Sequence, residues 1–230
     1  MARKATPKAE ASAQKILDAA LELFRERGFD GATMRDIARK AGVATGAAYY
    51  YYPSKDALVL AFYQHASAEM QPRIEAALAG ARGLEAGLRE LIRVKLDYFA
   101  PNRPVLRALL RNGADPKHPL SPFSPETGAI RAFDLEWFRR ILSDCGFGIP
   151  RDLAPHLPDV LWLFQMGVIY FWVTDDSPGQ ARSYRLLDRA AKAVAVLVRL
   201  SALPLMRPVR KVALELIAIV KGPDDTAVPA

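Results

Sequence analysis

Apolar residues recur at helical spacing along most of the chain, and the alternation typical of β-strands is nearly absent. The first run has apolar residues along one side of a helix: Ile16, Leu17, Ala20, Leu21, Leu23 and Phe24. Ser12 is a suitable N-cap for this helix, and Gly28 is a clear stop. The pattern therefore predicts an all-α protein.

Two short helices are predicted next. One begins after Thr33, whose hydroxyl caps it, while Asp36 at the third helical position completes a capping-box variant. It ends at Gly42, where a left-handed backbone costs least. The other covers roughly residues 45–51 and ends before Pro53, because a proline disfavours helical geometry in the preceding residue. Two short helices joined at a glycine predict a helix-turn-helix, whose second helix enters the major groove of DNA.

The remaining sequence predicts a helical bundle. Ser54 caps a longer helix, and Pro- and Gly-rich breaks separate the segments beyond residue 80. The predicted bundle helices are 84–100, 104–112, 125–145, 154–174, 180–203 and an amphipathic last segment, 208–220, whose role the sequence does not indicate.

Composition favours a soluble, cytoplasmic protein with no membrane partner. Of the 230 residues 51% are hydrophobic, so a sizeable core can form. The single cysteine, Cys145, excludes an intramolecular disulfide, and no targeting segment is apparent. The apolar stretch 160–173 is interrupted by Gln165 and is short for a membrane span. Residues 1–55 hold 10 Lys and Arg against 6 Asp and Glu, which suits either a phosphate-facing module or solubility.

The run Tyr49–Tyr52 is the strongest functional signal. Successive helix residues point about 100° apart, so four in a row cannot share one buried face. We expect the core-facing row to be Ala44, Ala48 and then Tyr51 or Tyr52, which leaves Tyr49 and Tyr50 outside.

The predicted outer face combines those two phenols with Thr45, Gly46 and Ala47. Small residues permit close approach to DNA, and phenols bind phosphates or pack on thymine methyl groups. An aromatic patch used for packing is the alternative. Lys55, at the start of the next helix, would complete a phosphate site at the helix N-terminus, or else is simply solvated. Arg35, unfavourable in the first turn of its helix, needs either a DNA partner or an ion pair with Asp36 or another neighbour.

Residues 12–60, and above all GFDGATMRDIARKAGVATGAAYYYYPSKDAL, resemble the DNA-binding domain of the TetR family of transcriptional regulators. The resemblance implies a ligand-responsive repressor that dimerises on a palindromic operator in double-stranded DNA. It places Thr33 and Arg35 against DNA, assigns base reading to Thr45, Gly46, Ala47 and Tyr49, and assigns backbone contacts to Tyr50, Tyr51 and Lys55. Ala48 and Tyr52 depart from the family, which usually has a larger apolar residue and phenylalanine there. A basic arm, Arg3, Lys4 and Lys8, either follows the DNA or is a solubilising tail.

In the second domain, TetR-like proteins dimerise and enclose a ligand. A stripe of mostly small residues within 180–203 predicts a homodimer interface, although an intramolecular core explains it too; its residues are Leu187, Ala191, Val194, Ala195 and Val198. Aromatic residues around Gln165 indicate either a core or a site for a hydrophobic small-molecule ligand; the candidates are Phe99, Trp137, Phe138, Trp162, Gln165 and Tyr170.

We therefore expect a disordered basic arm (1–11), a helix-turn-helix domain (12–60), a helical ligand-binding and dimerisation domain (61–220) and a disordered tail (221–230), with no cofactor or metal. A ligand-independent architectural DNA-binding protein shares the first half of this argument. An enzyme is disfavoured because His65, His118 and His156 lack metal-ligand spacing and no phosphate-binding glycine loop or nucleophile motif is present. The sequence does not distinguish a repressor from an activator.

Overall fold

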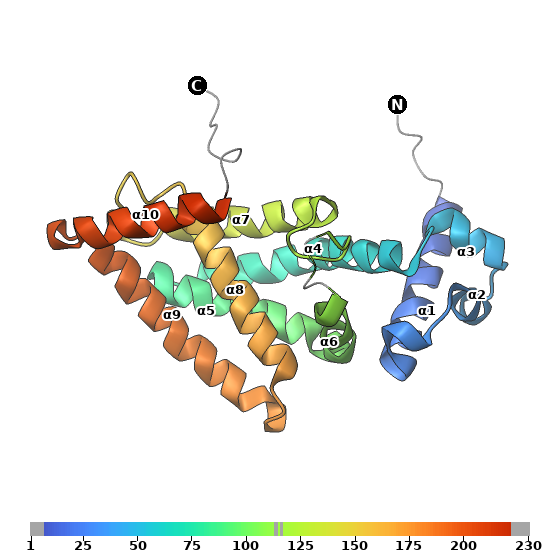
Figure 1. Ribbon diagram of the computed structural model, residues 1–230. Helices are drawn as coiled ribbons and strands as arrows, with labels where there is room; N and C mark the ends of the chain where they lie inside the picture. The colour runs from blue at the N-terminus through green and yellow to red at the C-terminus, as the bar shows by residue number, and fades with distance from the viewer. Residues whose placement is uncertain (1–6, 113–114, 116, 222–230) are drawn as a thin grey trace. The chain divides into compact units, whose positions relative to one another are not determined.

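The computed structural model describes residues 7–112, 115 and 117–221, and all regular structure within them is helical (Figure 1), which confirms the predicted fold class. The α-helices are α1 (Pro7–Gly31), α2 (Met34–Ala41), α3 (Thr45–Tyr51), α4 (Lys55–Ala79), α5 (Gly83–Phe99), α6 (Arg103–Asn112), α7 (Gly128–Ser143), α8 (Leu157–Thr174), α9 (Ala181–Ser201) and α10 (Arg207–Lys221). Short 3₁₀ turns precede α6, α7, α9 and α10: Ala100–Asn102, Pro125–Thr127, Pro178–Gln180 and Pro204–Met206.

Within the described part of the chain these helices form two compact units. The first unit is drawn from Met1–Arg73 and Lys95–Phe133, and the second from Ile74–Val94 and Asp134–Ala230. Helices α4, α5 and α7 each contribute residues to both units.

Helix α1 is longer than predicted at its N-terminal end. The predicted cap Ser12 lies inside the helix, where its hydroxyl donates to the carbonyl of Lys8, so the prediction of a cap was wrong. Residues 7–11 are helical rather than disordered, since Pro7 suits a first helical position. Gly28 interrupts the helix as predicted, with φ of 76°. The predicted tail from 222 onward and residues 1–6 lie outside the described residues.

The turn between α2 and α3 forms as the sequence predicts. The Thr33 hydroxyl accepts from the Asp36 amide, and the Asp36 carboxylate accepts from the Thr33 amide, which completes the capping box. Gly42 ends α2 with φ of 69°, a conformation that favours glycine. At the start of α4 the Ser54 hydroxyl accepts from the Ala57 amide, so the predicted cap is confirmed.

The core of the first unit extends well beyond residue 60. Ile16, Leu23 and Phe24 of α1 pack in one cluster with Ile37, Ala48, Leu58 and Phe62, and that cluster also contains Val105, Leu109 and Leu120. The guanidinium of Arg25 on α1 donates to the side-chain oxygen of Asn102 at 3.0 Å. Helix α6 thus belongs with α1, and this division differs from the boundary expected near residue 60.

The second unit is organised by α8 and α9. Helix α8 buries Leu161, Gln165 and Trp172, and it is the helix of the described residues whose length and apolar composition would also suit a membrane span. Helix α9 begins beside Asp175, a buried carboxylate that accepts from the amide and hydroxyl of Ser183. Helix α10 is fixed by Arg210, which donates to Asp152 and to the carbonyl of Ser201, both at 2.7 Å.

Candidate nucleic-acid interface

The four tyrosines have different surroundings, because the helix turns them to different sides. Tyr49 is 50% exposed and Tyr50 is 83% exposed, while Tyr51 and Tyr52 are half-buried against the core of the first unit. Ala48 is fully buried beneath them. The exposure predicted for Tyr49 and Tyr50 is therefore confirmed.

The outer side of α3 continues from these phenols to small residues. Thr45 and Gly46 are exposed and Ala47 is half-buried, with open space where a Gly46 side chain would stand. Ala44 is exposed too, in extended backbone geometry just before the helix, so the prediction that it faces the core was wrong. The outer side of α3 thus combines two exposed phenols with small side chains.

Helix α2 adds an exposed cation beside this surface. Asp36 pairs with Arg39, one turn further along α2, and with the hydroxyl of Thr33. The hydrogen bond from Thr33 is the main reason why the pKa of Asp36 is lowered. Because Asp36 is engaged in this way, Arg35 has no ion pair among the described residues. The Arg35 side chain is exposed.

Lys55 lies at the start of α4 but is turned toward the protein. Its ammonium donates to the carbonyl of Phe29 at 2.6 Å and lies 4.5 Å from the centre of the Phe29 ring. The side chain is half-buried. One of its three N–H donors is therefore used in holding α4 to the end of α1, and two remain for an outside oxygen.

Sequence reasoning missed the ion pairs that hold α2 against α1. The Lys40 ammonium lies 2.9 Å from Glu22 and 2.8 Å from Glu26. The hydrogen bond with Lys40 lowers the pKa of Glu26, and the same contacts raise the pKa of Lys40. The signal was the i, i+4 pair of glutamates on the polar side of α1. These contacts fix the angle at which the helix-turn-helix is held.

The candidate ligand residues do not form one group. Trp137, Phe138, Trp162 and Gln165 are buried in the second unit, where the Gln165 amide donates to Asp134 at 2.7 Å. Phe99 belongs to the first unit, and its ring packs on Phe62 and Tyr63. Tyr170 is exposed on α8. Four of the six candidates thus share the interior of the second unit, and the other two lie elsewhere.

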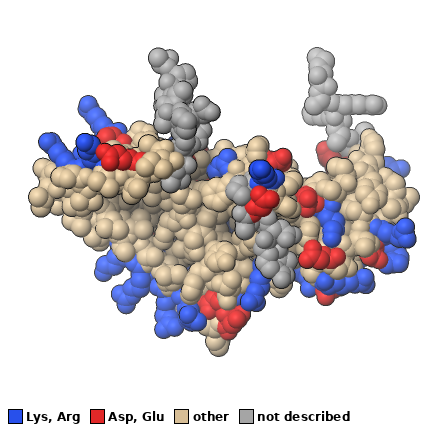
Figure 2. Space-filling view, in the orientation of Figure 1, with Lys and Arg blue, Asp and Glu red and all other residues tan. Residues whose placement is uncertain are grey.

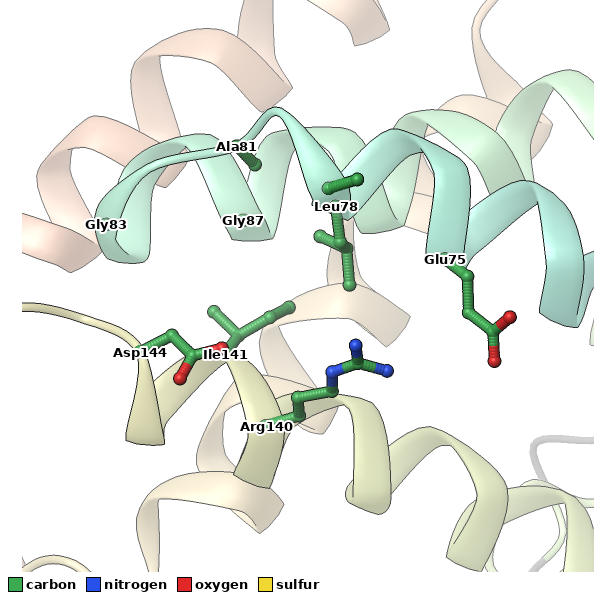
Figure 3. Close-up of a pocket in the computed structure, with 9 residues that line it drawn as sticks. Glu75, Leu78, Ala81, Gly83, Gly87, Arg140, Ile141 and Asp144 are labelled. Carbon is green, nitrogen blue, oxygen red and sulfur yellow. The ribbon is translucent and has the colours of Figure 1, made fainter.

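A small cleft lies between the end of α4, the start of α5 and the end of α7 (Figure 3). Glu75, Leu78 and Arg140 line it, and its volume is about 110 Å³. Gly87 allows α5 and α7 to approach closely here, since a Cβ at this position would lie 2.7 Å from Ile141 Cγ2. Sites for drug-sized ligands usually occupy ~300–1,000 Å³, so this cleft is too small for such a molecule.

The residues predicted for dimerisation face inward. Leu187, Ala191 and Val198 are buried within a single chain, and Val194 and Ala195 are half-buried. These small side chains allow α9 to pack closely inside the second unit, which is the intramolecular alternative. Leu187, Ala191 and Val198 are therefore not exposed on α9, and their assignment to a dimer interface stays an untested prediction.

A different apolar surface is exposed on the same two helices. On α8 it consists of Val160, Leu163, Gly167 and Tyr170, and on α9 of Leu186, Ala193, Leu197 and Leu200. We call these sets the outer apolar faces of α8 and α9. Figure 2 shows a broad area of uncharged surface on this unit, bordered along its lower edge by blue side chains.

The geometry above defines a helix-turn-helix head followed by helical structure, and sequence comparison gives the family. Residues 16–62 match the profile described as bacterial regulatory proteins, tetR family. Residues 88–213, more than half of the chain, match the profile of the tetracyclin repressor-like C-terminal domain. The chain belongs to the TetR family.

Among curated relatives, the regulator SrpR of Pseudomonas putida is 48% identical over 68 residues, which cover 28% of this chain and 32% of SrpR. The matched segment likewise spans 51% of TtgW from the same species. A longer match, to the regulator CymR of Pseudomonas putida, is 27% identical over 151 residues and covers 65% of this chain and 71% of CymR. The similarity to SrpR and TtgW is thus limited to a segment that spans about a third of SrpR and half of TtgW.

Solved structures share the fold at low identity. A TetR transcriptional regulator from Nitrosomonas europaea has a TM-score of 0.62 at 20% identity, covering 80% of this chain and 98% of that one. FadR from Bacillus subtilis, solved in complex with stearoyl-CoA, has a TM-score of 0.61 at 18% identity, covering 79% of this chain and 97% of FadR.

Proposed function

We propose that the chain is a transcriptional regulator that binds a palindromic operator in double-stranded DNA. The observation that carries this proposal is the outer side of α3, where Tyr49 and Tyr50 project beside Thr45 and Gly46. Large phenols on a seven-residue helix are costly to expose to water, and a DNA groove offers them both thymine methyl groups and phosphates. The unpaired Arg35 supports the same surface.

In this proposal, some residues of the site read bases and others contact phosphates. Tyr49, Thr45, Gly46 and Ala47 face the base edges, while Tyr50 and Lys55 contact phosphates. Thr33 contributes less through its hydroxyl, because that group already donates to Asp36 at 2.6 Å. Tyr51 is half-buried. In this proposal it contacts the DNA backbone from the edge of the site.

Selection from a random duplex library tests the DNA proposal. We expect enrichment of an inverted repeat with half-sites about one DNA turn, ~34–36 Å, apart or a little more. Tyr49→Ala loses ~1–3 kcal/mol of discrimination between operator and non-operator DNA. Tyr49→Phe keeps the ring but removes the hydroxyl group, so it separates packing of the ring on thymine methyl groups from hydrogen bonding by the hydroxyl. A library that shows no enrichment at low ionic strength contradicts the proposal.

The partner in this arrangement is a second copy of the chain. The outer apolar faces of α8 and α9 support this proposal, since their residues are exposed in the single chain and monomers rarely expose large contiguous apolar surfaces. Gly167 supports a helix crossing there. It lies inside α8 with nothing within 4 Å of where its Cβ would be, so a single chain gives no packing reason for a glycine. Glycine lets the backbone of a second helix approach closely.

The effector in this proposal is a hydrophobic small molecule that releases the regulator from its operator. Support comes from the buried side chains of Trp137, Phe138 and Trp162 and the buried Gln165–Asp134 hydrogen bond, all in the second unit, and from FadR, a fold relative solved with stearoyl-CoA. A shift from 99% bound to 99% free requires a preference of ~5.5 kcal/mol for the released state. The Arg25–Asn102 contact would transmit the change, because it joins α1 to the turn before α6.

A thermal-shift series with fatty acids and acyl-CoA esters tests this effector. A ligand at 100 times its Kd stabilises the native state by ~2.7 kcal/mol, which raises the melting temperature measurably. The same ligand should release the selected operator, and Trp162→Ala should abolish both effects. If no hydrophobic ligand shifts the melting temperature while operator binding persists, the ligand-independent architectural alternative is favoured.

A further inference from the structure

The side of α9 that faces away from the core carries a row of positive charge. Its cations are three, four, three and seven residues apart, so they lie along one side of the helix: Arg182, Arg185, Arg189, Lys192 and Arg199. All five are exposed. Figure 2 shows blue side chains projecting from this edge, with no red side chain between them. We call this set the basic row of α9.

Within residues 7–112, 115 and 117–221, the basic row has no ion-paired carboxylate. The one acidic residue of α9, Asp188, faces Arg93 of α5 at 3.7 Å. Among the described residues no carboxylate lies within ion-pair distance of the five cations. Asp175, at the N-terminal end of α9, accepts from Ser177 and Ser183 instead.

This arrangement is unfavourable for an isolated helix. Like charges three and four residues apart destabilise a helix. Arg182 is in the first turn of α9, where a cation also opposes the helix dipole. A bound polyanion would remove both penalties, whereas an ordinary solvated face mixes both signs of charge.

The basic row is also held in place. The guanidinium of Arg182 lies 5.6 Å from the centre of the Phe171 ring, and that of Arg199 lies 5.9 Å from the Phe147 ring. The opposite side of α9 is fixed in the core by Leu187 and Ala191. From Arg182 to Arg199 the row is ~26 Å long at 1.5 Å per residue. The two end cations thus lie against aromatic rings, and the helix backbone sets the line along which the other three are spaced.

We propose that the basic row of α9 binds the phosphate backbone of duplex DNA without sequence preference, as a second contact separate from α3. A helix with its side chains is ~10–12 Å wide, which matches a major groove of ~12 Å, and the row can follow the phosphates at its rim. An anionic membrane fits less well, because an interfacial helix inserts large apolar residues, and those of α9 lie on its outer apolar face, which is assigned above to the second copy of the chain. The centre of this row holds Arg185, Arg189 and Lys192, with Val196 as its apolar member.

Fluorescence anisotropy with a labelled duplex that lacks the operator tests this contact in the full-length protein. The variant Arg185→Gln/Arg189→Gln/Lys192→Gln removes three phosphate contacts per chain. The slope of log Kobs against log salt should become shallower by ~2.7 for each bound chain, since each contact contributes ~0.9. The control Arg139→Gln/Arg207→Gln/Lys211→Gln removes three exposed cations elsewhere in the second unit and should leave the slope unchanged.

Two further readouts make the result decisive. The α9 variant should keep the operator-to-random affinity ratio that Tyr49→Ala reduces, so failure of this inference and failure of the proposed function are distinguishable. Circular dichroism and sedimentation must show that the variant retains its fold and assembly. Equal slopes for the wild type and both triple variants overturn the proposal. Binding to phosphatidylglycerol vesicles that requires the basic row, with duplex binding unaffected, also overturns it.

Discussion

At the scale of single residues, position on a helix decides what a side chain does. Tyr49, Tyr50, Tyr51 and Tyr52 are chemically identical neighbours, yet two project into solvent and two pack on the core. The hydroxyl of Tyr52 donates to the carbonyl of Ala13 at 3.3 Å, which fastens the end of α3 to α1. The exposed pair therefore rests on a pair that holds the helix in place.

Lys55→Met separates the two roles of Lys55, because methionine keeps an apolar stem over the Phe29 ring but removes the charge. We expect the slope of log Kobs against log salt for operator binding to become shallower by ~0.9 for each bound chain. The melting temperature should also fall, since the Phe29 carbonyl loses its donor. An unchanged slope in a folded variant means that Lys55 makes no phosphate contact.

Local sequence predicted the parts of the site that depend on neighbouring residues. Thr33 and Asp36 form their capping box, and Gly42 adopts its left-handed turn, because both depend on three or four residues of backbone. The inward turn of Lys55 depends on Phe29, which is distant along the chain, and so could not be predicted from local pattern. The DNA contacts themselves stay predictions.

At the scale of elements, the start of α9 depends on one carboxylate. Both oxygens of Asp175 are used, one on the amide of Ser177 at 3.0 Å and the other on Ser183. Burial raises the pKa of Asp175, but the hydrogen bonds from Ser183 and Ser177 outweigh it and hold that pKa well below its ordinary value. An ionised Asp175 thus stabilises the turn into α9.

Asp175→Asn should lower the melting temperature at neutral pH. Because the folded-state pKa is depressed, the stabilisation by Asp175 is present above the unfolded-state pKa of ~3.9 and is lost as the pH falls below it. When melting is measured from pH 7 to pH 3, the melting temperature of the variant should therefore fall less at acid pH than that of the wild type. Asp30→Asn, at an exposed aspartate, should reproduce the wild-type curve. A parallel shift of the Asp175→Asn curve at every pH would contradict this role.

Helix boundaries followed from capping and turn residues to within a few positions. The helix predicted over 208–220 is α10, and the one predicted over 45–51 is α3. The error at Ser12 has a physical reason, because an alanine-rich segment continues a helix through a residue that could also cap it.

At the scale of the whole molecule, the pattern shows that α8 and α9 have apolar residues on several sides but not which side faces inward. Leu187 and Ala191 are buried, while Leu186 and Leu197 are exposed on another side of the same helix. Periodicity alone does not choose between these sides, because both repeat at helical spacing. The proposed assembly surface could therefore be located only on the folded chain.

Gly167→Ala should stabilise the single chain but weaken the proposed dimer. Alanine is ~0.5–1 kcal/mol better than glycine inside a helix, so the dissociated chain should become more stable. The added methyl group would enter the helix crossing, and overpacking of ~1–3 kcal/mol should raise the dimer dissociation constant by roughly 5- to 150-fold. Sedimentation and melting at high dilution measure both. Gly128→Ala, at the start of α7, should give the stabilisation alone. A dissociation constant unchanged by Gly167→Ala would place the crossing elsewhere.

The interleaved path of the chain also limits how such a protein can be recombined. The chain leaves the first unit after Arg73, returns at Lys95 and leaves again after Phe133. A gene fusion that kept residues 1–73 alone would lack Val105, Leu109 and Leu120, and would leave the apolar sides of α1 and α4 open to water. A chimaera that takes residues 1–73 of this chain should therefore fold only when residues 95–133 are transferred as well.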